Sequence, residues 1–374
     1  MKIGILTSGG DTQSLNAIIH GAAETAELYN NHLVGFMRGW KGVLSPISTK
    51  DISKHEINPA VGGTILKSSR TNPDDNILKV AAYNIEHTVD ALIAVGGDDS
   101  LTVGKKLLNY LKIPVCFVTK TIDNDVGKNA SADGSVEDII NYFNPGFPSA
   151  ARYAINKAQS LRTTAYSHDR IIFMEAMGRT PGWLALSSYR GNPDMILVPE
   201  APIDYEHFLA ELEDRYAKEE NAVVVVAEGV RYKGRSSPIR EDAKDIDEHG
   251  HKKLGGVAKT LSARVKEDLK ISRVDAEDRT LMYRSGSPTC LDRQTSMYLG
   301  KIAARTVIKG TTGQVAVLQR YGDDIRAEVR PIENVLDFDN MGRIIPRNID
   351  PRFYDKDNYC ITQLGKKYFE VINR

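Results

Sequence analysis

Short apolar runs alternate with segments of helical spacing along the first third of the chain. Near-continuous apolar runs of about six residues are typical of parallel strands that helices cover on both faces. The pattern therefore predicts an α/β fold in which the carboxyl ends of the strands meet at one rim, where sites form in such sheets. The four predicted strands are KIGILT (2–7), HLVGFM (32–37), ALIAVG (91–96) and PVCFVT (114–119).

The middle of the chain shows the same alternation. Residues 202–219 and 253–270 have apolar positions at helical spacing, and the block 284–310 opens with a turn and continues as a long helix. Residues 231–253 are polar and charged, which predicts a surface insertion or mobile loop. After about Asp337 the pattern predicts no clear strand. Further predicted strands are RIIFMEAMG (170–178), DMILVPE (194–200) and AVVVVAEGV (222–230).

Composition limits the possible functions. A chain of 374 residues is long enough for two lobes. It holds 49 Lys+Arg and 49 Asp+Glu, so no overall positive field favours nucleic acid or a membrane, and an anionic substrate must be held by local charge. Three widely spaced cysteines fit a reducing compartment, and a first strand that begins at Lys2 leaves no room for a signal peptide, so we expect a cytoplasmic protein. The histidines are scattered, which disfavours a zinc site.

Two glycine pairs each follow a predicted strand and precede a helical pattern. They are GGD at 9–11 and GGDDS at 96–100. Glycine lets the backbone approach a phosphate closely, and a helix N-terminus favours negative charge. Neither turn has the spacing of a dinucleotide fingerprint or a Walker loop. The structural alternative is that side chains such as Asp11, Asp98 or Ser100 only cap the following helices.

The acidic segment TIDND at 121–125 is the most informative feature. In extended geometry Thr121, Asp123 and Asp125 face one side. Closely spaced carboxylates repel one another and usually need a cation, and one of them can accept a proton from an attacking hydroxyl. The structural alternative is an Asx-rich turn after the strand. Phosphate-binding turns together with clustered acids indicate magnesium-assisted phosphoryl transfer.

Together these segments resemble the phosphofructokinase family. The resemblance implies two Rossmann-like three-layer α/β lobes with mainly parallel sheets and the site in the cleft between them. We expect a donor-binding lobe of residues 1–138 plus about 284–335, and a sugar-binding lobe of about 139–283 plus 336–374. Members of the family are usually homo-oligomers, dimers or tetramers, in which a neighbouring subunit completes the sugar-phosphate site. The matching stretches, in family order, are ILTSGGDTQSLNAII, GGTILKSSR, AVGGDDS, TKTIDNDV, SHDRIIFMEAMGRTPGWLAL, MILVPE, VVVVAEGV and RSGSPTCLDR.

The resemblance also implies roles for single residues. Asp123 resembles the base that deprotonates the sugar hydroxyl, and Asp98 resembles the carboxylate linked to Mg²⁺. Gly9 and Arg70 would contact the transferred phosphoryl group, where Arg70 would counter the charge that builds on its oxygens. The other implied contacts are Thr121 and Asp125 at the transfer site; Gly10, Gly97, Asp99, Ser100 and Lys120 at the donor; Met177, Gly178, Arg179 and Glu228 at the sugar; and Arg170 and Arg284 at the distal phosphate of the sugar, with Arg170 placed to reach across a subunit boundary.

Two positions bear on the identity of the donor. Relatives that use ATP typically have Gly at the positions of Asp99 and Lys120. Here Asp99 would crowd and repel an α-phosphate, which discriminates against ATP, and Lys120 would add positive charge beside the transferred group. The pair resembles the pyrophosphate-dependent branch; the structural alternative is that Asp99 only caps a helix and Lys120 only pairs with it. The segment Gln13-Ser14-Leu15 also departs from the usual small-Pro-Gly type, which changes how the donor loop packs.

At the acceptor the chain departs from the family pattern. Relatives that use fructose 6-phosphate typically place His or Tyr three residues before the position of Arg284, and Arg or Lys nine residues before it. This chain has Leu281 and Asp275 there. An acid beside a substrate phosphate is unfavourable. Arg273 or Arg279 takes its place if the local alignment is shifted.

The leading hypothesis is a phosphotransferase that uses pyrophosphate, Mg²⁺ and an Asp general base to phosphorylate the 1-hydroxyl of fructose 6-phosphate. The alternatives are a pyrophosphate-dependent kinase of an unphosphorylated polyol or cyclitol or of a larger sugar phosphate, and an ATP-dependent 6-phosphofructokinase. A non-catalytic sugar-phosphate sensor is disfavoured because Asp98, Asp123 and Asp125 are all present. A nicotinamide oxidoreductase is disfavoured because the chain has no dinucleotide fingerprint.

Overall fold

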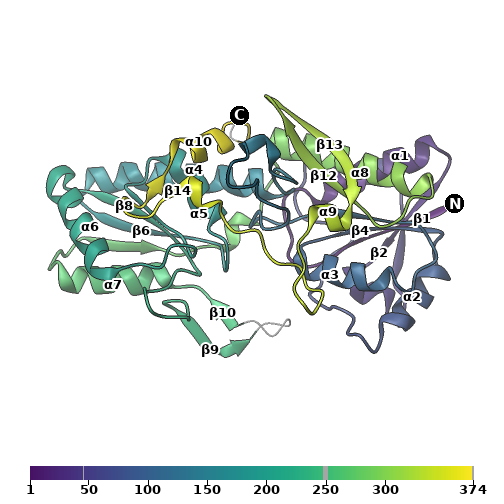
Figure 1. The fold of residues 1–374 in the computed structure, drawn as a ribbon, viewed down its shortest axis with the longest axis horizontal. Coiled ribbons are helices and arrows are strands. Elements are labelled where there is room, and N and C mark those ends of the chain that lie inside the picture. The colour runs from purple at the N-terminus through teal and green to yellow at the C-terminus, as the bar shows by residue number, and fades with distance from the viewer. Residues whose placement is uncertain (45, 247–251, 373–374) are drawn as a thin grey trace. The chain divides into compact units, whose positions relative to one another are not determined.

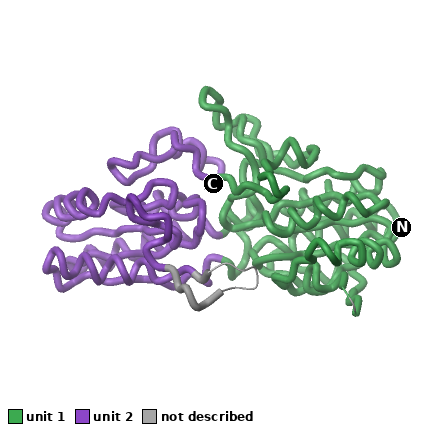
Figure 2. Tube along the Cα trace, turned by 60° about the horizontal axis from the view of Figure 1, so that its bottom comes forward, with its two compact units in different colours: residues 1–149, 284–347, 374 green, residues 150–283, 348–373 purple. Residues whose placement is uncertain are grey.

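The computed structural model describes residues 1–44, 46–246 and 252–372. The chain divides into two compact units (Figure 2). Unit 1 consists of Met1–Ser149 and Arg284–Arg347. Unit 2 consists of Ala150–Tyr283 and, in the described part of the C-terminal stretch, residues 348–372.

Unit 1 is built on a seven-stranded sheet in the order β13-β12-β5-β4-β1-β2-β3. The five central strands run parallel, and β3 and β13 add antiparallel edges. All four strands predicted in the first third are confirmed, whereas β3, β12 and β13 were not predicted. The strands are β1 (Lys2–Thr7), β2 (His32–Phe36), β3 (Thr49–Ile52), β4 (Ala91–Gly96), β5 (Val115–Thr119), β12 (Gln314–Tyr321) and β13 (Asp324–Pro331).

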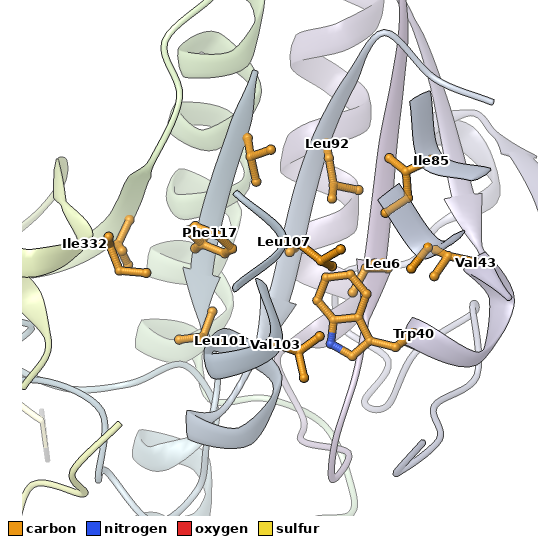
Figure 3. Close-up of a cluster of buried hydrophobic side chains, with 14 of the residues drawn as sticks. Leu6, Trp40, Val43, Ile85, Leu92, Leu101, Val103, Leu107, Phe117 and Ile332 are labelled. Atoms are coloured by element: carbon orange, nitrogen blue, oxygen red, sulfur yellow. The ribbon is translucent and has the colours of Figure 1, made fainter. Parts of the chain in front are cut away.

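Helices cover both faces of this sheet. Helices α1 and α8 lie on one face, and α2 and α3 lie on the other (Figure 1). Between the sheet and the second pair lies a core in which Trp40, Leu101 and Phe117 are fully buried (Figure 3). The helices of unit 1 are α1 (Leu15–Leu28), α2 (Leu78–Glu86), α3 (Asp98–Leu107), α8 (Cys290–Ile308) and α9 (Ile332–Val335), with 3₁₀ turns η1 (Gly39–Val43), η2 (Lys54–Glu56) and η3 (Val136–Asp138).

Unit 2 has a four-stranded parallel sheet in the order β11-β6-β8-β7. Ala165 of α4 packs on one face, against Ile172. The next residue, Phe173, points to the other face, where its ring lies 6.4 Å from that of Phe208 on α6. The strands are β6 (Ile171–Ala176), β7 (Met195–Leu197), β8 (Ala222–Ala227) and β11 (Val274–Glu277); the helices are α4 (Phe147–Ser167), α5 (Trp183–Ser187), α6 (Tyr205–Glu219), α7 (Val257–Asp268) and α10 (Gln363–Phe369), with 3₁₀ turns η4 (Ser188–Gly191), η5 (Leu281–Tyr283) and η6 (Pro351–Phe353).

Two segments differ from their prediction. The polar stretch that was expected to be a loop contains an antiparallel pair, β9 (Glu241–Ile246) with β10 (Lys252–Leu254), while residues 247–251 of that prediction lie outside the described part. The C-terminal stretch, expected to have no strand, contains the short pair β14 (Tyr354–Asp355) and β15 (Cys360–Ile361). The first pair is formed by charged segments and the second by strands of two residues, so neither shows the apolar alternation by which a strand is recognised in a sequence.

Two boundaries between the units lie later in the chain than residues 138 and 335, where the boundaries between the lobes were expected. Unit 1 continues to Ser149 because the backbone of this segment joins its sheet, with the Tyr142 N–H donating to the Leu318 carbonyl at 2.6 Å. It continues to Arg347 in the second segment because that residue binds the chain near Asn124. The expected roles of the two units as donor and sugar lobes stay predictions.

No described helix is both long enough and apolar enough to cross a membrane. The described cysteines form no disulfide. Cys116 is buried within β5 among apolar residues, and this burial raises its thiol pKa to about 12.

Helices α1 and α8 cross closely because each has a glycine at the crossing. A Cβ atom on Gly300 would lie 2.0 Å from the Ile18 carbonyl oxygen, and one on Gly21 would lie 2.1 Å from that of Met297. Neither carbonyl belongs to a movable side chain, so a larger residue must push the helices apart. This contact holds α8 against α1, which covers the same face of the sheet of unit 1.

We expect Gly300→Ala to destabilise the protein by about 1–3 kcal/mol through this overpacking, although Ala is otherwise the better helix former. Urea unfolding measures the effect. The exposed Arg305 on the same helix provides the control, and Arg305→Ala should stay within about 0.5 kcal/mol of the wild type. Equal stability of the two variants would contradict the close crossing.

Candidate active site

The glycine pair after β1 forms a tight turn. The chain segment just before Arg70 packs against this turn. Gly9 has a φ of +81°, a conformation that glycine adopts without strain. Its N–H donates to the Ser69 carbonyl at 3.2 Å, and the Ser68 hydroxyl donates to the Gly9 carbonyl at 2.5 Å. These bonds hold the exposed residue Arg70 in the chain segment that borders the turn.

Two cations flank the same turn. The buried Lys120 donates from Nζ to the Gly10 carbonyl. The Arg284 guanidinium lies against Gly10, where a Cβ would be 2.6 Å from Nη1, and the same nitrogen lies 3.4 Å from the Asp11 carbonyl oxygen. Gly10 is therefore needed for the arginine to approach. Arg284 was assigned to the distal phosphate of the sugar, and that role stays a prediction; in unit 1 its guanidinium lies at the Gly9–Gly10 turn.

Burial makes Lys120 an unusual lysine. Desolvation, reinforced by the positive charge of Arg284, lowers its pKa to about 8, although Asp11, Asp125 and Asp98 act in the opposite direction. An anionic ligand placed here would favour the charged form further. Lys120 and Arg284 thus place two positive charges at the Gly10 turn, and a second cation is what favours an anion there.

The second glycine pair leads directly into α3. The helix begins at Asp98, and its N-cap is Gly97, without any side-chain cap bond. The alternative that Asp98 or Ser100 caps this helix is therefore wrong, and Asp98 and Asp99 both lie in its first turn, where acids favour the helix dipole. The Ser100 hydroxyl is buried and lies 3.5 Å from the position that a Cβ on Gly9 would take, so it faces the first turn.

The acidic segment after β5 is a turn and not an extended strand. Asn124 is in the left-handed conformation with φ of 56°, and the Asp123 N–H donates to the Thr121 hydroxyl at 3.0 Å. The prediction that alternate side chains face one side by extended geometry is therefore wrong, because hydroxyl and Asx side chains bind the local backbone. The acids still converge, since the negative charges of Asp98 and Asp123 both raise the pKa of Asp125.

Asp125 is the focus of this negative charge. Burial is the largest cause of its raised pKa, followed by Asp98 and Asp123, and a hydrogen bond from Thr121 acts against them. Its Oδ1 atom is buried and has no hydrogen-bond partner among the described residues. An orphaned carboxylate oxygen among like charges fits a site that gains a cation with its ligand.

The described carboxylates at this site do not form a complete metal cage, but they are of the kind that binds Mg²⁺. Within the described part, no three His, Cys, Asp or Glu side chains are arranged to hold an ion alone. Mg²⁺ usually binds through one or two carboxylates, waters and substrate phosphates, so a complete protein cage is not required. Asp98 and Asp125 are oxygen ligands of the right kind, and the phosphates of a ligand at the glycine turns would supply the rest.

In unit 2, the predicted sugar contacts gather at the carboxyl ends of β6 and β8. The Gly229 N–H donates to the Gly178 carbonyl at 3.0 Å, and the Glu228 N–H donates to Ala176 at the end of β6. Gly178 has a φ of +142° and little space for a side chain, since a Cβ would lie 2.6 Å from the Pro181 carbonyl oxygen. The members of this group are Met177, Gly178, Arg179 and Glu228, and they occupy the rim where ligands bind in parallel sheets.

Arg170 lies at the opposite end of β6 and is paired with the acid that departs from the family pattern. Its Nη1 lies 2.8 Å from Asp275 Oδ2, and the two side chains are 38% and 52% exposed. Arg273 is no free substitute, because it donates to the His168 carbonyl and lies 3.3 Å from Asp169. Leu281, at the other departing position, is 78% exposed.

Comparisons with known proteins bear on the family and the fold of the chain. The family model described as Phosphofructokinase matches residues 2–307. A pyrophosphate–fructose 6-phosphate 1-phosphotransferase of Amycolatopsis methanolica is 37% identical over 87% of this chain and 92% of its own length, and one of Dictyoglomus thermophilum is 34% identical over 95% and 97%. An ATP-dependent 6-phosphofructokinase 3 of Streptomyces coelicolor is also 34% identical, over 87% and 92%.

Solved structures show the same fold. A pyrophosphate-dependent phosphofructokinase from Nitrosospira multiformis superposes with a TM-score of 0.83 at 20% identity, covering 100% of this chain and 92% of that one. A second, from Marinobacter aquaeolei, gives 0.80 at 20% identity, covering 100% and 91%. The predicted α/β fold with mainly parallel sheets is therefore confirmed.

The lowered pKa of Lys120 predicts pH-dependent anion binding. The ammonium is charged below about pH 8 and neutral above it, so affinity for inorganic pyrophosphate should fall as the pH rises through that value. The same shift means that between about pH 8 and 10.5 the unfolded chain holds a proton that the folded chain has lost, so the cost of burying Lys120 falls as the pH rises.

Calorimetric titration with pyrophosphate between about pH 7 and pH 9 measures this effect. Lys120→Met should remove the step and leave only the titration of pyrophosphate itself. A step of equal size in the variant would contradict the assignment to Lys120.

Proposed function

Because the chain belongs to the phosphofructokinase family, we propose that it transfers a phosphoryl group from pyrophosphate to the 1-hydroxyl of fructose 6-phosphate. The observation that carries the proposal is the set of charges in unit 1. Lys120 and Arg284 flank the Gly9–Gly10 turn, and Asp98, Asp123 and Asp125 converge beside it.

In the proposed reaction, pyrophosphate lies on the glycine turn with its charge balanced by Lys120, Arg284 and Arg70. Asp123 accepts the proton of the sugar hydroxyl as the hydroxyl oxygen bonds to the nearer phosphorus. The bond from this phosphorus to the bridging oxygen breaks, and inorganic phosphate leaves. Asp98 would hold Mg²⁺, which would supply positive charge against the negative charge that develops on the transferred group.

Burial and like charge support a carboxylate as the base. Both raise the pKa of Asp125, so the acidic turn contains a carboxylate that takes up a proton more readily than usual. Thr121 links the two acids, since its hydroxyl accepts from the Asp123 N–H and hydrogen-bonds the Asp125 carboxylate. We assign the base to Asp123 by the family motif and a supporting electrostatic role to Asp125.

Pyrophosphate is favoured over ATP by the residues that the chain has at the donor. Asp99 is exposed in the first turn of α3, one residue after the proposed metal-linked Asp98. A nucleotide would have to carry its α-phosphate past this carboxylate, which pyrophosphate does not. Lys120 contacts the turn at Gly10 and supplies charge to the transferred group. Relatives named for each donor are about equally similar, so these two residues carry the choice.

A second acceptor class is favoured by one observation, the ion pair between Arg170 and Asp275. If Arg170 binds the 6-phosphate, the sugar must compete with a carboxylate of this chain. An unphosphorylated polyol or cyclitol needs no such exchange. We also propose a homo-oligomer, on the family resemblance alone.

An initial-rate matrix of pyrophosphate and ATP against several acceptors tests the proposal. We expect turnover with pyrophosphate and fructose 6-phosphate, with release of phosphate, and a loss of about 100-fold or more in kcat for Asp123→Asn, which excludes a contaminating kinase. Turnover with ATP but not with pyrophosphate would overturn the proposed donor. Turnover of a polyol but not of fructose 6-phosphate would overturn the proposed acceptor. Asp275→Asn separates the acceptors further, since it should lower KM only for an acceptor whose phosphate binds Arg170.

Replacing Asp99 tests donor discrimination. Asp99→Gly should raise kcat/KM for ATP by roughly tenfold, about 1.4 kcal/mol, because the repulsion of the α-phosphate is removed. Asp99→Asn keeps the size and removes the charge, so it shows which of the two matters. Unchanged use of ATP in both variants would mean that Asp99 serves only the start of α3.

A further inference from the structure

Arg347, the last residue of unit 1, binds the backbone of the acidic turn. Its side chain is buried, with 4% of the residue exposed. Nε and Nη2 donate to the Asn124 carbonyl at 3.1 and 2.8 Å, while Nη1 donates to the carbonyls of Asn141 at 2.8 Å and Ile140 at 3.4 Å. Its backbone N–H donates to the Asp125 carbonyl at 2.6 Å. One residue thus binds the backbone of both Asn124 and Asp125.

We propose that Arg347 is a positioning residue that holds the carboxylates of Asp123 and Asp125 in place for phosphoryl transfer. The inference rests on the function proposed above for these acids. Asn124 stands between them, and its carbonyl, which receives two donations from Arg347, belongs to the peptide group between Asn124 and Asp125. Fixing that peptide limits the positions available to both side chains.

The opposite side of the turn is held by two asparagine side chains, those of Asn141 and Asn144. The Asn124 Oδ1 accepts from the backbone N–H of Asn144 at 3.1 Å and from its side-chain nitrogen at 3.3 Å. Asn141 Nδ2 donates to the Val126 carbonyl at 2.7 Å. The left-handed Asn124 is therefore held through its side chain by Asn144 and through its carbonyl by Arg347, which leaves the turn little freedom.

Gly127 provides the space that the guanidinium occupies. It has a φ of +147°, and a Cβ there would lie 2.9 Å from Arg347 Nη1 and 2.5 Å from the Ile140 carbonyl oxygen. A side chain at this position would displace the guanidinium or the carbonyl that it binds. The arginine and the glycine are thus complementary, although they are far apart in the sequence.

A lysine cannot replace this arrangement. Three nitrogen atoms of a planar guanidinium reach carbonyls of three residues at once, whereas an ammonium is a single point on a flexible stem. The proposed role depends on several directed hydrogen bonds, so it predicts that charge alone does not restore function. A misplacement of about 1 Å in a catalytic group costs on the order of 100-fold in rate.

Arg347→Lys is the decisive variant, with Arg343→Lys as its matched control. Arg343 belongs to the same segment, but its side chain is 64% exposed and pairs with Asp339. We expect kcat of Arg347→Lys to fall about 100-fold, with the KM values for donor and acceptor changed by less than about threefold, and Arg343→Lys to match the wild type. Gly127→Ala should reproduce the loss in kcat from the other partner. A wild-type kcat in Arg347→Lys would overturn the proposal.

A measurement on the wild-type protein does not depend on any variant folding or on turnover. In protein labelled with ¹⁵N-arginine, the guanidinium protons of Arg347 should exchange with solvent at least about 100-fold more slowly than those of Arg343, because each bound proton is buried. Equal exchange would overturn the proposal even if the enzyme is active. Slow exchange in a protein that shows no phosphoryl transfer with any donor would leave the contact intact and reject the proposed function instead.

Discussion

The proposed function depends on opposite charges that lie close together in unit 1, in a space largely closed to water. Lys120 is buried with its ammonium on the Gly10 carbonyl, and it lies near Asp98 and Asp125, whose own charges repel each other. In such surroundings an ammonium loses its proton more easily and a carboxylate gains one more easily. Neither pKa shift stabilises the folded protein. The arrangement is therefore typical of a functional site, whose charges would be balanced when a phosphate and a cation bind.

The parallel sheet explains how these groups meet. The turns at Gly9, Gly96 and Lys120 follow β1, β4 and β5, which are neighbours in the sheet and end at the same edge. Strand ends in a parallel sheet bring together residues that are distant in the chain without any special interaction. The close crossing of α1 and α8 then brings the start of the second segment, with Arg284, to the same edge.

The sequence was informative wherever one local rule decided the structure. Apolar runs identified the central strands, and the glycine pairs and acids identified residues that the structure brings together at the strand ends of unit 1, although their role at a donor stays a prediction. The antiparallel pair β12–β13 was not predicted, although β12 is largely buried and β13 is the partly exposed edge strand. The geometry of the acidic turn was predicted wrongly, because the left-handed Asn124 depends on Asn144 and Arg347, which lie 20 and 223 residues away in the chain. Arg347 has no sequence pattern of its own; only its contacts show what it does.

Arg284 in unit 1 and Arg170 in unit 2 lie in different electrostatic surroundings. The strength of the Arg170–Asp275 ion pair decides whether the proposed acceptor should change. Arg284 lies beside another cation at a glycine turn, where an anion is the missing charge. Arg170 already has Asp275 as its partner, but that pair is 38% and 52% exposed, and such surface pairs contribute only about 0–1 kcal/mol. A phosphate that binds the guanidinium through charged hydrogen bonds gains about 1.5–3 kcal/mol for each bond, which exceeds the loss of the pair. Asp275 should therefore weaken the binding of a sugar phosphate without preventing it, and fructose 6-phosphate stays the leading acceptor.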